Sequence, residues 1–436
     1  PEAIHELIEL DPDLPNAEFH QKITPAQAKA LKRAIAQVKI LDPACGSGNF
    51  LYVTLDLLKG LESEVLRRLE DVTGSAQLRL DIAQVNPSQF LGIEINPRAA
   101  AIADLVIWIG YLQWHFRRFG DIPPIEPVLR EYNNIECRDA VLAYDAIEPD
   151  VDAAGKVRTR WGGRMMKSPV TGEDIPDPTD KVTIYRYLNP RAAGWQEADY
   201  IVSNPPFIGN ARMRDRLGDG YAEALRKVYK DVPDTVDFVM YWWHKAAELV
   251  RSSQVERFGF ITTNSIHQAR LRSVIEFHLN HQKSIKLFLA IPDHPWTDEG
   301  AAVRISMTAG EFNHSKFERL AQWGTLISED EGLTPEDSAD RIKITWKSFD
   351  RIFSNLRAGT DVTKSQVLRA NFNLVSRGVM SGSEGFQVAS QDLDLVETDL
   401  LRTYINGRDL LHNSRNKLII DTVGLTEKKL QKKYPK

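Results

Sequence analysis

The sequence is poor in cysteine, with only Cys45 and Cys137 among its 436 residues. Two cysteines cannot form the disulfide framework of a small secreted domain, and such scarcity is typical of proteins from reducing compartments. No secretory signal peptide opens the chain, and no apolar run is long enough to cross a bilayer. The most apolar stretch, LVIWIGYLQW (105–114), is short and predicts a core helix. We therefore expect a cytoplasmic protein that does not contact a membrane.

Three motifs of common reaction centres are also missing from the sequence. No H-E-x-x-H pattern and no Cys/His cluster occurs, so we expect no metal site. The phosphate loop G-x-x-x-x-G-K-[ST] is absent. No Pro-Cys pair is present, so nothing supports a covalent cysteine route to a base carbon. The net charge of −5 argues against a wholesale polyanion binder, although local basic patches can still contact phosphates.

Strand-like and helix-like segments alternate from about residue 36 to 310. This alternation predicts an α/β fold, in which a mostly parallel sheet carries helices on both faces. The last two strand-like segments, 285–291 and 301–309, are separated only by PDHPWTDEG. A connection this short cannot make a right-handed crossover, so these two strands should be antiparallel neighbours.

The alternation of strands and helices is interrupted once and stops before the end of the chain, and these two places suggest domain boundaries. Residues 146–195 are rich in Pro, Gly, Asp and Thr and predict an inserted loop or small hairpin. Because the chain starts at Pro1 and stops just after a strand-like segment, we interpret it as a piece of a longer protein. The expected domains are a helical lead-in at 1–35, an α/β domain at 36–320, a linker at 321–370 and the start of a second domain at 371–436.

The stretch DPACGSG (42–48) lies between a buried strand and an amphipathic helix. Gly46 and Gly48 allow positive φ and the close approach of a ligand, which the positive end of the helix can hold. The dinucleotide pattern G-x-G-x-x-G is only half present, because Leu51 occupies the third glycine position. The stretch therefore predicts either a ligand cradle or a structural turn.

Acids follow the next two strands. Glu94 in GIEINP (92–97) ends a strand, and an acid at that place typically accepts hydrogen bonds from ribose hydroxyls. Asp139 in ECRDA (136–140) again follows a strand and could face the adenine of a nucleoside. Each acid has the alternative of being an ordinary surface residue at a strand end.

The sharpest signal is an apolar strand that ends in Asn204-Pro205-Pro206-Phe207. Two prolines remove two backbone donors and stiffen the chain, which leaves carbonyl oxygens free for an external donor. Asn204 adds a side-chain acceptor and Phe207 a flat face for stacking. This combination suits a planar amine.

In this order, DPACGSG, GIEINP, ECRDA and NPPF resemble the S-adenosylmethionine-dependent amino-methyltransferases of DNA, in their gamma-type motif order. Closer still is the resemblance to the MmeI-like restriction–modification proteins and related phage-defence methyltransferases. It rests on LDPACGSGNFLY, GIEINPRAAAIADLVIWIGYLQW, SNPPFIGN, TTNSIHQ, HPWTDEGAAVRISM and YINGRDL, which span most of residues 20–412.

The resemblance implies a role for each matching residue. The cofactor's methionine side would be lined by Asp42, Ala44, Gly46 and Gly48, and closed over by Thr24 and Pro25 of HQKITP. Its ribose and adenine would be held by Glu94, Ile95, Asp139 and Ala140. The target base would meet the catalytic residues Asn204, Pro205, Pro206 and Phe207, with Trp296 stacking on its second face.

The resemblance also implies a class I, Rossmann-like methyltransferase fold with S-adenosylmethionine as the cofactor. The reaction would methylate the N6 amine of an adenine flipped out of double-stranded DNA, within a restriction–modification or phage-defence protein. A nuclease upstream and a target-recognition domain downstream, beginning at 371–436, would complete that protein. The alternatives are N4-cytosine methylation, RNA or protein-glutamine methylation, and a non-catalytic cofactor-binding module.

Overall fold

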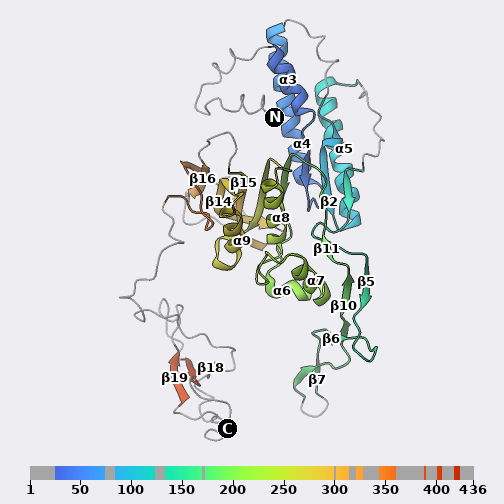
Figure 1. Ribbon diagram of the computed structural model, residues 1–436, viewed down its shortest axis with the longest axis vertical. Coiled ribbons are helices and arrows are strands. Elements are labelled where there is room, and N and C mark those ends of the chain that lie inside the picture. The colour runs from blue at the N-terminus through green and yellow to red at the C-terminus, as the bar shows by residue number, and fades with distance from the viewer. Residues whose placement is uncertain are drawn as a thin grey trace. The chain divides into compact units, whose positions relative to one another are not determined.

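The computed structural model describes residues 25–73, 84–122, 133–168, 172–298, 301–313, 321–327, 343–359, 387–388, 400–404 and 417–422 (Figure 1). The chain divides into two compact units, residues 1–363 and 364–436. The second unit contains a three-stranded antiparallel sheet in the order β18-β20-β19. Its strands are β18 (Gln387–Val388), β19 (Leu401–Tyr404) and β20 (Lys417–Ile420).

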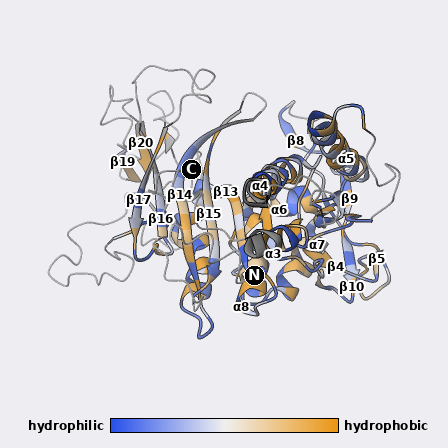
Figure 2. Ribbon diagram, turned by 90° about the horizontal axis from the view of Figure 1, so that it is seen from above, coloured by the Kyte–Doolittle hydropathy of each residue, from blue (hydrophilic) through white to orange (hydrophobic). Residues whose placement is uncertain are grey.

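The first unit is built on a nine-stranded sheet in the order β17-β16-β14-β15-β13-β12-β1-β2-β3. Figure 2 shows the strands β13 to β17 side by side, with apolar residues in orange. Five neighbouring strands are parallel: β3 (Ile135–Cys137), β2 (Phe90–Glu94), β1 (Ile40–Asp42), β12 (Tyr200–Ser203) and β13 (Arg257–Thr263). The chain order reverses between β1 and β12, where ligands of doubly wound sheets bind. The predicted α/β class is confirmed.

Neighbouring residues of the central strands pack in two different hydrophobic cores, one on each face of the sheet. Ile40 and Phe90 pack in one core with α3 (Pro25–Ile35), α4 (Asn49–Thr73) and α5 (Pro97–Phe119). Leu41 and Leu91, one position further, pack in the other core, which includes α8 (Val239–Arg251) and α9 (Ala269–Leu279). Successive side chains of a strand point to opposite faces. The helices therefore cover both faces of the sheet, as predicted.

Helix α5 corrects the expectation that no segment is long enough to cross a bilayer. Within the described residues this one helix passes that test by length and composition, which is weak evidence because core helices pass it too. Ile107, Trp108 and Tyr111 are buried, and α5 packs against α4, β2 and β3. In this fold the helix is part of the layer that covers the sheet.

Beyond β13 the sheet contains more strands than the sequence predicted. Strands β14 (Ile285–Asp298) and β15 (Ala301–Phe312) are antiparallel neighbours, which confirms the prediction for 285–291 and 301–309. However, PDHPWTDEG is mostly strand, because β14 continues past a bulge between Ile291 and His294. Residues 321–370 are not simply a linker either, since β16 (Ala321–Ile327) and β17 (Lys343–Phe349) extend the sheet by pairing with β14 and with each other. The composition of this region did not indicate these strands, because their pairing depends on strands elsewhere in the chain.

Residues 146–195 form a long hairpin of nested antiparallel strand pairs, in keeping with the predicted insertion. The pairs are β5 (Ala146–Pro149) with β10 (Tyr185–Leu188), β6 (Thr159–Trp161) with β9 (Lys181–Thr183), and β7 (Met165–Lys167) with β8 (Asp174–Pro176). At its base β4 (Leu142–Ala143) pairs with β11 (Arg191–Ala192).

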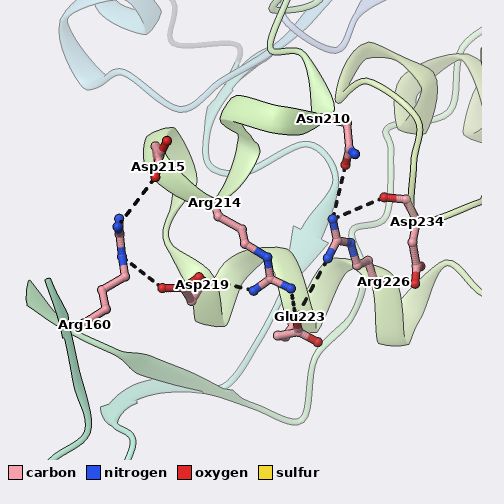
Figure 3. A network of polar contacts seen from close by, with 8 residues as sticks. All are labelled: Arg160, Asn210, Arg214, Asp215, Asp219, Glu223, Arg226 and Asp234. Atoms are coloured by element: carbon pink, nitrogen blue, oxygen red, sulfur yellow. Dashed lines mark hydrogen bonds and ion pairs between the residues drawn. The ribbon is translucent and has the colours of Figure 1, made fainter. Parts of the chain in front are cut away.

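The hairpin is fixed to two helices that follow β12, α6 (Asn210–Leu217) and α7 (Asp219–Val228). A Cβ atom on Gly220 of α7 would lie 1.6 Å from the carbonyl oxygen of Tyr185, so only glycine allows this approach. Arg160 of β6 forms ion pairs with Asp219 at 2.9 Å and with Asp215 at 3.5 Å; Figure 3 shows this network. The same network continues through Arg214, Glu223 and Arg226 to Asn210, at the start of α6.

Candidate active site

The carboxyl ends of β1 and β12 are tied together by Asp42. This side chain is 1% exposed, and its Oδ1 accepts hydrogen bonds from the Ala44 amide at 3.0 Å and the Ser203 hydroxyl at 2.5 Å. Burial raises the pKa of Asp42 to about 7, against the opposing effect of these hydrogen bonds. Asp42 therefore shapes the site mainly through the backbone of the glycine-rich loop and through Ser203.

The two predicted glycines differ in their surroundings. Gly46 has φ +54°, and a Cβ atom there would meet nothing within 4 Å. Gly48 has φ +87°, but its Cβ would lie 3.0 Å from the Cα atom of Ala103 in α5. Gly46 thus borders open space above the loop, whereas Gly48 allows α5 to pack closely. On the other side, the indole of Trp242 donates to the Pro43 carbonyl oxygen at 3.0 Å.

Glu94 at the end of β2 holds the same loop from the other side. One carboxylate oxygen accepts from the Gly46 amide at 2.9 Å and the other from the Asn96 amide at 2.8 Å. Asn96 in turn caps α5, since its Oδ1 accepts from the Arg98 amide at 3.0 Å. The structure therefore brings the DPACGSG and GIEINP motifs into direct contact, 48 residues apart in the sequence.

Ile95 and Asp139 line one cavity of about 750 Å³ beside β3 and the base of the hairpin. Ile95 is 67% exposed, which leaves an apolar surface next to Glu94. Asp139 already has three partners: its Oδ1 accepts from the amides of Val141 at 2.7 Å and Leu142 at 3.0 Å, and its Oδ2 from the Tyr221 hydroxyl at 2.7 Å. Ala140 is buried. Asp139 therefore holds the backbone after β3 and the Tyr221 side chain in place, and it also lines the cavity.

These features fit the adenosyl part of S-adenosylmethionine. A half-buried carboxylate lies at the end of β2, an exposed apolar side chain follows it, and Gly46 leaves open space above the loop. Thr24 lies outside the described residues, and of Pro25 the structure describes only that it begins α3. In the described part of the chain, no group of three or more His, Cys, Asp or Glu residues could hold a metal ion.

The loop after β12 carries the second half of the site. Asn204 is partly buried, and its side-chain Oδ1 is inaccessible to solvent and has no hydrogen-bond partner. The Pro205 carbonyl oxygen accepts no hydrogen bond from any described residue. Pro206 and Phe207 are exposed, the latter at 36%. Two acceptors and an exposed aromatic ring therefore lie within four consecutive residues.

Residues that the sequence did not single out hold this loop in place. The Phe238 amide donates to the Ile208 carbonyl oxygen at 2.9 Å, and Asp237 accepts from the Asn210 amide at 2.9 Å. The second oxygen of Asp237 accepts from the Ser265 hydroxyl at 3.4 Å. Asp237 follows no motif and no strand, so nothing in the sequence distinguished it from a helix-start acid.

Trp296 lies on β14, opposite Val303 of β15, rather than on a loop. Strand β13 ends at Thr263, which pairs with Ile305, so the part of the hairpin that holds Trp296 extends beyond the end of β13. Trp296 is therefore at the same edge of the sheet as Asn204. Its contact with a target base stays a prediction.

The chain is similar to a family of DNA-methyltransferase domains, to a DNA methyltransferase and to a solved restriction–modification enzyme. Residues 19–316 match the family described as MmeI, DNA-methyltransferase domain. DNA methyltransferase A of Bacillus subtilis (strain 168) is 26% identical over 241 residues, which make up 55% of this chain and 22% of that protein. The structure of the type IIL restriction–modification enzyme MmeI in complex with DNA is similar with a TM-score of 0.61 and 20% identity, over 95% of this chain and 49% of that one. The chain thus spans about a fifth of the curated relative and about half of the solved one.

Proposed function

Because the chain belongs to the family of MmeI DNA-methyltransferase domains, we propose that it methylates the N6 amine of an adenine flipped out of duplex DNA. The methyl donor would be S-adenosylmethionine, bound at the carboxyl end of the sheet. The observation that carries this proposal is the buried, unpaired Oδ1 of Asn204. A buried polar atom without a partner is unfavourable, so its persistence beside an exposed aromatic ring favours an external donor.

An exocyclic amine is a poor nucleophile, because its lone pair is delocalised into the ring. Acceptors on its two hydrogens favour the pyramidal nitrogen that attacks, and stabilise the positive charge that develops there. Asn204 Oδ1 and the Pro205 carbonyl oxygen are free to accept those hydrogens. Phe207 offers its ring for stacking on the base. The base must leave the duplex to reach these groups.

The cofactor supplies an activated methyl group on a sulfonium. Glu94 would bind the ribose hydroxyls, Ile95 would contact the adenine, and the loop at Ala44 and Gly46 would border the methionine part. The role of this chain's residues is to orient the amine and the donor for an in-line transfer, which by positioning alone can lower the barrier substantially.

The same two acceptors and the Phe207 ring could serve the N4 amine of cytosine, so the choice of adenine rests on the motif resemblance. We also propose that the chain works within a restriction–modification or phage-defence protein. In that protein, a nuclease upstream and a recognition domain that includes residues 371–436 would act with it. Methylation of RNA or of protein glutamine, and binding of cofactor without catalysis, are the remaining alternatives.

One experiment tests methylation of DNA and separates adenine from cytosine as the target. Duplex DNA from cells that produce the protein is digested to nucleosides and analysed by mass spectrometry, with DNA from cells that produce the Asn204→Ala variant as the control. The proposal expects N6-methyladenine that depends on Asn204. N4-methylcytosine would show that cytosine is the target. If the protein binds the cofactor but the DNA contains neither modified base, methylation of DNA is refuted.

A further inference from the structure

A second cavity, of about 710 Å³, lies beyond the end of β13 and beside the bulge of β14. Its lining includes Asn264 and His267 from the 3₁₀ turn η3 (Asn264–His267) and the facing residues Asp293 and Arg304 of β14 and β15. The lining also includes Trp323 of β16 and, from the turn after β17, Asn355, Arg357 and Ala358. The cofactor and target-base residues do not contribute to it.

This cavity is structurally coupled to the loop that carries Asn204. Strands β12 and β13 are neighbours, with Ser203 opposite Phe260, so η3 starts at the same edge of the sheet as that loop. Ser265 of η3 donates to Asp237, whose other oxygen accepts from the Asn210 amide at the end of the loop. The cavity therefore lies at the same edge of the sheet as Asn204 and is linked to its loop through Asp237.

The lining carries more positive than negative charge. Asp293 is its only acid, and Arg304 binds it with two hydrogen bonds of 2.5 and 2.7 Å, which hold the pKa of Asp293 below its ordinary value. This pair is neutral as a whole. Arg357 has no acidic partner among the described residues, and the Nδ1 of His267 is buried without a hydrogen bond. An anion would give Arg357 a partner of opposite charge and the Nδ1 of His267 a hydrogen-bond acceptor.

The turn that presents Arg357 is held in an unusual conformation. Leu356 is fully buried with φ +56°, a region that non-glycine residues rarely occupy. Its carbonyl oxygen accepts from the Trp323 indole at 2.9 Å, and the Phe353 amide donates to the Arg357 carbonyl oxygen at 2.9 Å. These contacts fix the backbone of Arg357 at the rim of the cavity, which reduces the entropy lost when its side chain binds a ligand.

We propose that this cavity binds a backbone phosphate of the DNA strand next to the flipped base, with Arg357 as the main contact and His267 as a hydrogen-bond donor. The inference rests on the proposed action on DNA. A guanidinium binds phosphate oxygens through two parallel hydrogen bonds. Contacts to phosphates set the register of a protein on the duplex, and register here decides which base can reach Asn204.

The test measures binding of the 436-residue chain to a short duplex by fluorescence anisotropy over a range of salt concentrations, with S-adenosylhomocysteine present. Arg357→Ala should weaken binding about five- to tenfold at low salt and reduce the slope of log K against log salt by about 0.9, the value for one lost phosphate contact. Arg357→Lys should keep the slope, because the charge remains. Arg351→Ala is the matched control, since Arg351 lies on the same segment but its guanidinium stacks on Phe353 outside the cavity.

A second measurement locates the contact. Single phosphates beside the methylated base are replaced by uncharged methylphosphonates, and one position should weaken the wild type but not Arg357→Ala. Equal losses in Arg357→Ala and Arg351→Ala, or no position that depends on Arg357, would overturn the phosphate site. DNA binding that depends on Arg357 without any methyl transfer would refute the proposed methylation and leave the phosphate site intact.

Discussion

Replacement of Asn204 by alanine should have opposite effects on stability and on catalysis. The free protein buries the Oδ1 atom without a hydrogen bond, and such an unpaired group costs about 1–3 kcal/mol. Asn204→Ala removes that cost and loses some packing of the carboxamide, so the free energy of unfolding should rise by about 1 kcal/mol. In a unit of this size the melting temperature should increase by roughly 1–2 °C. A structural asparagine would show the reverse sign.

The same change should nearly abolish methyl transfer. Loss of one donor or acceptor that is aligned with charge in a transition state typically lowers kcat by about 10²- to 10³-fold. The affinity for S-adenosylmethionine should change less than about twofold, because the proposed contact of Asn204 is with the amine and not with the cofactor. Asn204→Asp keeps the acceptor oxygens and should retain more activity than Asn204→Ala. Differential scanning fluorimetry measures the melting temperature, calorimetric titration measures the cofactor affinity, and transfer of a tritiated methyl group measures kcat. Wild-type rates in Asn204→Ala, or a loss of more than 2 kcal/mol in stability, would refute the reasoning.

Three further predictions concern the cofactor side. Glu94→Ala should weaken S-adenosylmethionine binding by roughly 1–3 kcal/mol in calorimetry, since it removes the proposed ribose acceptor and the hydrogen bond that holds the Gly46 amide; unchanged binding in the folded variant would exclude Glu94 from the site. The raised pKa of Asp42, about 7, means that the folded state binds a proton which the unfolded state releases near pH 4. The free energy of unfolding should therefore fall by up to roughly 1.4 kcal/mol per unit as the pH rises from about 4 to 7, and Asp42→Asn should flatten this dependence in denaturant titrations. Gly46→Ala should reduce cofactor binding with only about 1 kcal/mol lost in stability, whereas Gly48→Ala should destabilise more because Ala103 lies 3.0 Å away, and equal melting temperatures would contradict the distinction.

The positions of motifs at strand ends were predictable because they depend on neighbouring residues. A buried apolar strand followed closely by Pro43 or Pro205 ends there, and a nine-residue connection between two strands forces them to lie antiparallel. The order of these motifs along the chain then places them at one edge of a parallel sheet. The α/β class follows from the same local patterns.

Partners from distant strands could not be predicted in this way. Asp42 and Asp139 look alike in the sequence, as acids at strand ends, yet Asp42 is buried against Ser203 and Asp139 is bound by Tyr221. The strands at 321–327 and 343–349 lie in a region that becomes more polar, and they are specified by the strands they pair with, β14 and each other.

The sequence by itself indicated the candidate residues for the chemistry, since short motifs such as Asn204–Phe207 constrain their own backbone. The tertiary structure decided which of their polar atoms remain free. Asn204 Oδ1 is unpaired and Asp139 is not, and Arg357 lies beside a cavity at the end of a neighbouring strand. The physical reason is that backbone conformation depends on local sterics, whereas hydrogen-bond partners and burial depend on contacts made by the whole folded chain.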